Sequence, residues 1–159
     1  GYGFTFGENG IYRGGVSCTG MEFCNLAITE TKAFTKALVE NLTSKFPQMK
    51  ETLRIHVTGC PNSCAQYQIG DIGLIGTLKI IDKVKYEAFH IAVGGGLGEK
   101  AAFNRQIFRQ IVATRIPLAL EAMIRIYQEK RAAQDTFNSF CSRHNTEELV
   151  QIFANPHVV

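Results

Sequence analysis

Four of the five cysteines fall into two short-range pairs, and this pattern constrains the chain more than any other feature. Cys18 and Cys24 enclose five residues, whereas Cys60 and Cys64 enclose three within the run Thr-Gly-Cys-Pro-Asn-Ser-Cys. Thiolates are soft ligands, and four of them suit either a [4Fe–4S] cluster or a structural zinc ion. Zinc sites usually enclose about two to four residues at both ends. The wider first pair therefore favours a cluster.

The length and composition fit one domain with an ordinary core. The chain has 159 residues, of which 45% are hydrophobic and 19% charged, and no apolar run approaches the ~20 residues of a membrane span. Residues 1–15 lack the basic start and apolar centre of a secretory signal, and the first residue is Gly1, so we expect the sequence to be a piece of a longer protein. Five cysteines without such a signal predict a reducing, cytoplasmic environment.

Hydrophobic periodicity predicts a helix directly after the first cysteine pair. Apolar residues recur at steps of three or four from Ala27 to Phe46, with Asn25 as a plausible N-cap. A helix that begins there would direct its positive dipole end toward an anionic cluster, with a contribution of typically ~0.3–1 kcal/mol. Residues 1–15 are rich in glycine, and Asn9-Gly10 predicts a turn between two short apolar pieces.

The remaining chain predicts strands followed by helices. Residues 53–57 alternate with period two, and residues 73–81 and 86–93 predict a hairpin with its turn at Asp82-Lys83. A helix is expected from Ile116-Pro117, a short second one after Thr136, and a third opened by a capping box at Asn145 and Glu148. We predict an α+β fold in one domain, residues 1–159. Its parts are a turn-rich start (1–15), a core with a small mixed or antiparallel sheet covered by helices (16–112), and C-terminal helices (113–159).

The two cysteine motifs resemble the cluster-binding signature of the sirohaem-containing sulfite and nitrite reductases, in particular the single-chain ferredoxin-dependent type. The resemblance extends to residues 26–36, 65–66, 71–74 and 93–96 and to the C-terminal segment. It implies the sirohaem and 4Fe-4S domain fold of that family. It also implies that Cys18, Cys24, Cys60 and Cys64 hold a [4Fe–4S] cluster, and that Cys64 in addition bridges to the sirohaem iron.

The resemblance implies further cofactor contacts and partners. Asn62 is placed to bond cluster sulfur or a sirohaem carboxylate, and the Gly94-Gly95-Gly96 turn to approach the sirohaem with its backbone amides. Members of the family have two related halves, and this chain resembles the second. The residues that hold the anionic substrate lie in the missing N-terminal half, so this piece alone is expected to be inactive. Ferredoxin is the implied electron donor, with neither nucleic acid nor membrane as a partner.

Four other features have simpler explanations. The Gly94 turn does not match either nucleotide-binding pattern, because position 99 is Glu99 rather than glycine. His56 shares the polar phase of its strand, which predicts a solvent-facing or hydrogen-bonded side chain. Cys141 stands alone at helical spacing and is expected to be a small core residue. Arg105 and Arg109 could pair with sirohaem carboxylates or be solvated.

Two functions remain open on this pattern. The first is the cluster- and sirohaem-binding part of a reductase that converts sulfite to sulfide or nitrite to ammonia, each by six electrons. The second is a zinc- or cluster-stabilised structural or electron-transfer module without reductase activity. A bacterial-ferredoxin type of carrier is disfavoured, because the chain lacks the compact Cys-x2-Cys-x2-Cys run.

Overall fold

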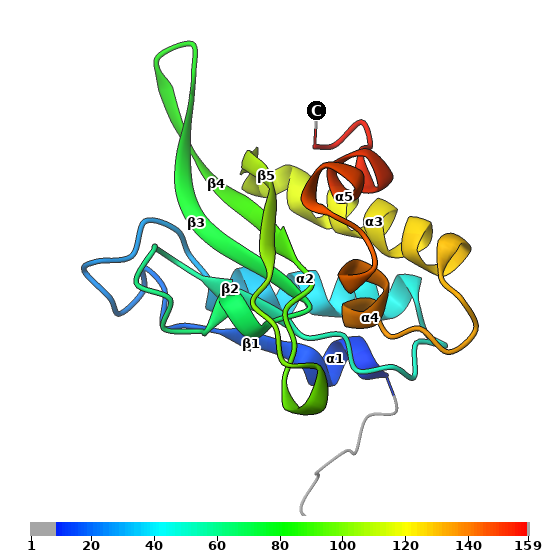
Figure 1. Ribbon diagram of the computed structural model, residues 1–159. Coiled ribbons are helices and arrows are strands. Elements are labelled where there is room, and N and C mark those ends of the chain that lie inside the picture. Colours follow the sequence, from blue (N-terminus) through cyan, green and yellow to red (C-terminus); the bar gives the residue numbers. More distant parts are fainter. Residues whose placement is uncertain (1–8, 159) are drawn as a thin grey trace, which may run out of the picture.

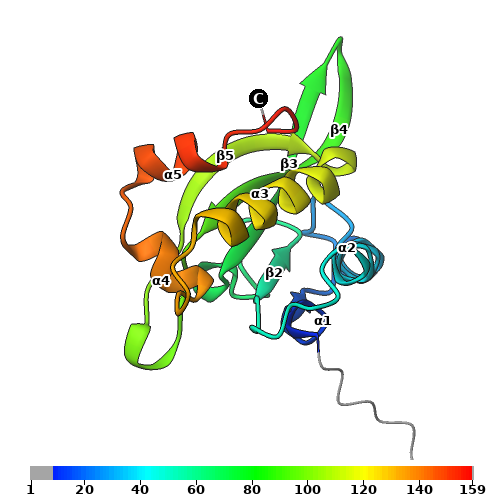
Figure 2. The same ribbon diagram turned by 90° about the vertical axis from the view of Figure 1, so that its right-hand side faces the viewer.

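The computed structural model describes residues 9–158, and they form a five-stranded mixed sheet covered mainly on one face by helices (Figures 1 and 2). The sheet order follows the chain, β1-β2-β3-β4-β5. The strands are β1 (Gly15–Ser17), β2 (Ile55–Thr58), β3 (Ile72–Ile81), β4 (Val84–Val93) and β5 (Arg105–Val112). The helices are α1 (Gly10–Gly14), α2 (Lys32–Lys45), α3 (Ile116–Lys130), α4 (Phe137–Ser142) and α5 (Thr146–Phe153). The predicted α+β class is confirmed.

Strand pairing in the sheet changes from parallel to antiparallel at β3. The pairs β1–β2 and β2–β3 are parallel, whereas β3–β4 and β4–β5 are antiparallel. Parallel neighbours need a crossover connection, and α2 supplies it between β1 and β2. The turn at Asp82 and Lys83 has positive φ at both residues, 50° and 65°, which is the geometry of a tight hairpin turn, so the predicted turn is confirmed. The β3–β4 hairpin projects well beyond the rest of the sheet (Figure 1).

The core lies between the helices and one face of the sheet. Side chains alternate across a strand, so Ile55 and Val57 of β2 and Ile72 and Leu74 of β3 point to the same face. That face packs against α2 and α3, whose apolar stripes include Leu38, Leu42, Leu120 and Met123. None of the helices formed by residues 9–158 combines the length and apolar character that a membrane crossing would need.

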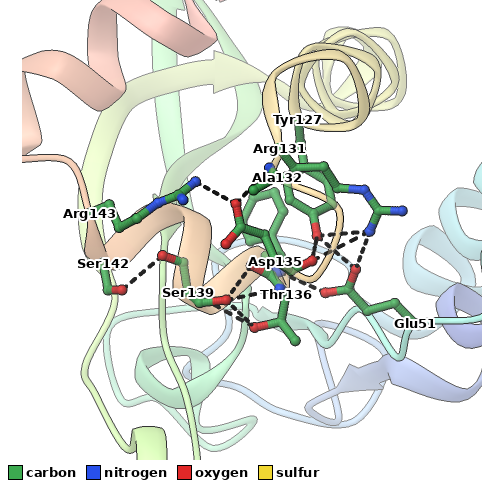
Figure 3. Close-up of polar contacts among 10 residues, drawn as sticks. Glu51, Tyr127, Arg131, Ala132, Asp135, Thr136, Ser139, Ser142 and Arg143 are labelled. Carbon is green, nitrogen blue, oxygen red and sulfur yellow. Dashed lines mark hydrogen bonds and ion pairs between the residues drawn. The ribbon is translucent and has the colours of Figure 1, made fainter.

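A partly buried polar network and an aromatic cluster hold the C-terminal helices to the rest of the fold. Glu51, in the loop before β2, accepts hydrogen bonds from the Tyr127 hydroxyl (2.7 Å), from Arg131 (3.2 Å) and from the backbone N–H of Phe137 (2.6 Å) (Figure 3). Tyr127 also packs edge-on against Phe137 and Phe140, at ring-centre distances of 5.0 and 5.5 Å. The end of α3, the start of α4 and the loop before β2 thus form one unit.

Two predicted helix caps are present, whereas the predicted N-terminal turn is not. The caps at Thr136 and Asn145 are confirmed, since both residues form capping boxes, with Ser139 and Glu148 respectively. The prediction of a turn at Asn9-Gly10 is wrong. The Asn9 side chain instead accepts hydrogen bonds from the N–H groups of Ile11 and Tyr12 and caps the start of α1. The other half of that predicted turn, residues 4–6, lies outside the described residues. Strand β5 was not anticipated, because its apolar residues Ile107, Phe108 and Ile111 do not alternate regularly across the bulges in its pairing with β4.

Candidate metal centre

The sheet topology brings the two cysteine pairs to one place. Strands β1 and β2 are parallel neighbours, so their carboxyl ends meet at the same edge, and the loops that follow them leave on the same side (Figure 1). Ser17 is in register with Val57, and the N–H of the next residue, Cys18, donates to the Val57 carbonyl at 3.0 Å. Cys60 follows β2 by two residues. Cys18 and Cys60, distant in sequence, are thereby brought to the same edge of the sheet.

All four thiols line a single cavity. Its volume is about 380 Å³, and its wall contains Cys18, Cys24, Cys60 and Cys64 together with Asn62. That volume is roughly a dozen times the ~30 Å³ share of one water molecule in the liquid. Within residues 9–158, no three His, Cys, Asp or Glu side chains converge closely enough to hold one metal ion. The cavity has room for a group of several atoms.

The four thiols differ in their access to solvent. Cys60 is buried, Cys18 and Cys24 are half-buried, and Cys64 is exposed. A side chain that bridges two groups must be reachable from both, and Cys64 has the most open position of the four. Ser63, inside the Cys60–Cys64 loop, and Gln66, just after it, both adopt the left-handed region, with φ of 62° and 51°.

The first cysteine loop is a tight turn closed on Gly20. Gly20 has a φ of 73°, and a Cβ on it would lie 2.5 Å from the Thr31 hydroxyl oxygen, so only glycine fits there. Its carbonyl accepts the N–H of Cys24 at 3.0 Å, which closes the turn between the two thiols. Phe23 lines the cavity, but its side chain is 68% exposed. The ring instead receives the ammonium group of Lys32 at 4.7 Å from its centre.

The Cys18 thiol has a pKa below its ordinary value. Burial by itself raises the pKa, but the polar groups of Thr31, Gly59, Gly20 and Thr58 around the sulfur together outweigh burial. The Gly59 N–H donates to Cys18 Sγ at 3.2 Å, and the Thr31 hydroxyl oxygen lies 3.6 Å from the same sulfur. Hydrogen bonds to the charged form favour it, so this environment stabilises the thiolate that a metal requires.

The predicted helix start at Asn25 is wrong. Helix α2 begins at Lys32, eight residues after Cys24, and residues 25–31 form an irregular segment. The Glu30 carboxylate caps the helix by accepting the N–H groups of Ala33 and Phe34 at 3.2 and 2.9 Å. Thr31, the N-cap residue, lies beside Cys18. The amino end of α2 is thus near the cavity, but Asn25 does not form it. Asn25 therefore does not direct a helix dipole toward the cavity, contrary to the prediction.

The glycine turn after β4 is a packing feature in this structure. The N–H groups of Gly94, Gly95 and Gly96 donate to the carbonyls of Asp71, Gly70 and Ala102, at 2.9 to 3.1 Å. A Cβ on Gly95 would lie 2.3 Å from the Gly70 carbonyl oxygen. Asn138 donates to the carbonyls of Gly94 and Gly95 from the other side. The amides that were expected to reach sirohaem carboxylates therefore already have partners, and a role for these glycines toward sirohaem stays a prediction.

Three other candidate residues have structural partners. His56 is buried, and its Nδ1 lies 3.1 Å from the Gln66 carbonyl, as the hydrogen-bonded alternative predicted. Arg105 is half-buried and donates to the carbonyls of Cys141 and His144, both at 2.6 Å, around the end of α4. Cys141 is fully buried, which raises the pKa of its thiol and confirms it as a core residue. Sequence reasoning missed Thr31, which no motif marks and which only the packing places at Cys18.

A match to a protein-family model shows which family the chain belongs to. The family model described as "Nitrite and sulphite reductase 4Fe-4S domain" matches residues 12–154, nearly the whole chain and all four cavity cysteines. The chain belongs to this family. The matched range includes Cys18, Cys24, Cys60 and Cys64, which line the cavity.

Relatives of this 4Fe-4S domain include enzymes named for either anion. The chain is 34% identical over 145 residues to the assimilatory ferredoxin-dependent nitrite reductase of Haloferax mediterranei, covering 90% of this chain and 25% of that protein. It is 38% identical over 141 residues to sulfite reductase [ferredoxin] 1 of Mycolicibacterium paratuberculosis, covering 84% and 25%. The solved structure of the Mycobacterium tuberculosis NirA protein aligns with a TM-score of 0.76 at 27% identity, over 84% of this chain and 26% of that one. The chain thus spans about a quarter of these proteins.

Proposed function

We propose that this chain is the cluster- and sirohaem-binding part of a ferredoxin-dependent reductase that converts sulfite to sulfide or nitrite to ammonia. The observation that supports the proposal most strongly is the single cavity lined by both cysteine pairs, from loops at the carboxyl ends of adjacent parallel strands. The family match and the names of the relatives support the reaction class. Relatives named for both anions match the chain, so the proposal includes both substrates.

In this proposal Cys18, Cys24, Cys60 and Cys64 hold the [4Fe–4S] cluster, and the exposed Cys64 also ligates the sirohaem iron. When bound, the two cofactors supply one-electron transfer and a site where the anion is reduced. Asn62, on the cavity wall, offers an amide toward cofactor sulfur or a carboxylate. The residues that bind the anion would come from the N-terminal half of the same reductase, and ferredoxin would supply the six electrons one at a time.

The test is metal analysis of the anaerobically purified chain, before and after reconstitution with iron and sulfide. We expect about four iron and four labile sulfide per chain and broad absorption near 400 nm. One zinc per chain without sulfide, or no metal after reconstitution, would contradict the cluster assignment and favour the structural module.

The bridging role of Cys64 needs its own variant. Titration of sirohaem into the cluster-loaded chain should perturb the cluster spectrum of the wild type. In Cys64→Ser, any remaining cluster should not respond to sirohaem, whereas Asn62→Ala, altered two residues earlier in the same loop, should keep the response. An unchanged response in Cys64→Ser would remove the bridge from the proposal.

A further inference from the structure

Cys18 differs from the other cavity thiols in its polar surroundings. Among the hydrogen bonds of residues 9–158, the Cys18 sulfur is the one cysteine sulfur with partners: the Gly59 N–H at 3.2 Å and the Thr31 hydroxyl at 3.6 Å. Cys64, on the same cavity lining, is exposed to solvent. The donor environment of the four thiols is therefore asymmetric, and the asymmetry is present before any cofactor binds.

Both partners are held by the protein itself. The Gly59 carbonyl accepts the N–H groups of Ile28 and Thr29 at 2.7 and 3.2 Å, which ties the second cysteine loop to the segment after the first. Thr31 is fully buried, and its carbonyl accepts the N–H of Thr35 at 2.8 Å in the first turn of α2. These hydrogen bonds hold the backbone of both residues beside Cys18.

The Thr31 hydroxyl has two acceptors within reach on one residue. Its oxygen lies 2.9 Å from the Cys18 carbonyl oxygen, to which it donates, and 3.6 Å from Cys18 Sγ. A thiol can itself donate to the Thr31 oxygen, so the metal-free state satisfies both groups. A thiolate that ligates iron has no proton and only accepts. Rotation about one bond would then let the Thr31 hydroxyl donate to the sulfur.

We propose that Thr31 and the Gly59 N–H are the residues that set the reduction potential of the cluster, by donating hydrogen bonds to the Cys18 thiolate. The inference rests on the proposed function. One-electron reduction by the external donor adds negative charge to the cluster and its thiolates. Donors aimed at a thiolate stabilise that charge and raise the potential. Thr31 thus acts through Cys18 as a positioning residue.

The test is a spectroscopically monitored redox titration of the reconstituted chain, with dithionite as reductant. Thr31→Val removes the hydroxyl and keeps the branched shape, and we expect a midpoint potential below that of the wild type. Thr31→Ser retains a hydroxyl and should restore the wild-type potential. Thr35→Val is the matched control: Thr35 is also buried, one turn along α2, and its hydroxyl has no hydrogen-bond partner. It should leave the potential unchanged.

A second measurement covers the case in which Thr31→Val loads no cluster. Resonance Raman bands of the iron–cysteine bonds in the wild type should shift in deuterated water, because exchangeable N–H and O–H groups bond to a ligand sulfur, and the shift should persist in Thr31→Ser.

Three outcomes overturn the inference: no isotope shift in the wild type, an unchanged potential in Thr31→Val, or an equal change in Thr35→Val. A wild-type chain that binds no iron and sulfide overturns the proposed function and this inference together, so the two failures are distinguishable.

Discussion

The cysteine cavity and the helix-covered core are built in opposite ways. In the core, Tyr127, Phe137 and Phe140 are almost fully buried, and the Glu51 carboxylate has donors for both oxygens (Figure 3). At the cavity, Phe23 is exposed, and so is the Cys64 thiol. The core side chains thus pack against one another, whereas the cavity lining includes side chains that face solvent.

The largest expected effect is the loss of iron and sulfide when a cavity cysteine, but not the core cysteine, is replaced by serine. Cys60→Ser removes a cavity thiolate, and the reconstituted iron and sulfide content should fall to near zero. Cys141→Ser should leave that content unchanged, because Cys141 lies in the core. It should instead lower the free energy of unfolding by about 1–3 kcal/mol, since a hydroxyl without a partner replaces a buried apolar sulfur. Metal analysis and urea unfolding measure the two effects, and loss of iron in Cys141→Ser would break the comparison.

Two phenylalanines provide the next contrast. Phe140→Ala should lower the free energy of unfolding of the metal-free chain by about 3–5 kcal/mol, because it empties a fully packed site among aromatic rings. Phe23→Ala should change it by less than about 0.5 kcal/mol, since that ring is exposed. Urea unfolding followed by circular dichroism checks both. A large effect of Phe23→Ala would show that the cavity loops support the scaffold even without a cofactor.

The polar network should contribute less than the aromatic cluster. Glu51→Ala leaves the Tyr127 hydroxyl, Arg131 and the Phe137 N–H without their shared acceptor, and we expect a loss of about 1–3 kcal/mol. Glu121→Ala is the matched change on α3: it breaks an i,i+4 pair with the exposed Arg125, worth about 0.3–0.5 kcal/mol. Equal effects of the two variants in urea unfolding would contradict the role assigned to the network.

The smallest expected effect is a pH dependence within the scaffold. Burial, and then the nearby charge of Arg109, lowers the pKa of His90, whose Nδ1 accepts the Gln110 N–H at 3.2 Å. The unfolded chain, with a histidine pKa near 6.5, therefore binds more protons than the folded one as the pH falls through that value. Stability should decline from pH 7.5 to pH 5.5, and the decline should be smaller in His90→Asn. If His90→Asn reduces the decline equally in the metal-free and the cluster-loaded protein, the His90 contact belongs to the core and is independent of the cavity.

Local patterns predicted those parts whose cause is local. The helix after Ile116 follows from proline at its first turn and a continuous apolar stripe, and the cap at Thr136 and the capping box of Asn145 with Glu148 depend on residues close in sequence. The hairpin turn at Asp82 and Lys83 was predicted for the same reason. The start of α2 was misplaced because Asn25 is a good cap in isolation, whereas Glu30 makes the actual capping contacts. Strand β5 was missed because bulges disturb its alternation.

The sequence by itself determined the thiol donors, their two pairs and the family resemblance, because ligand chemistry and spacing are properties of residue type and order. Only the tertiary structure decided that both pairs line one cavity, since that depends on two parallel strands ending at the same edge. It also decided that Thr31 lies at Cys18, that Arg105 is engaged by α4, and that the amides of Gly94 to Gly96 have partners. These contacts join residues far apart in the chain, and no local pattern encodes which distant group will occupy a given space.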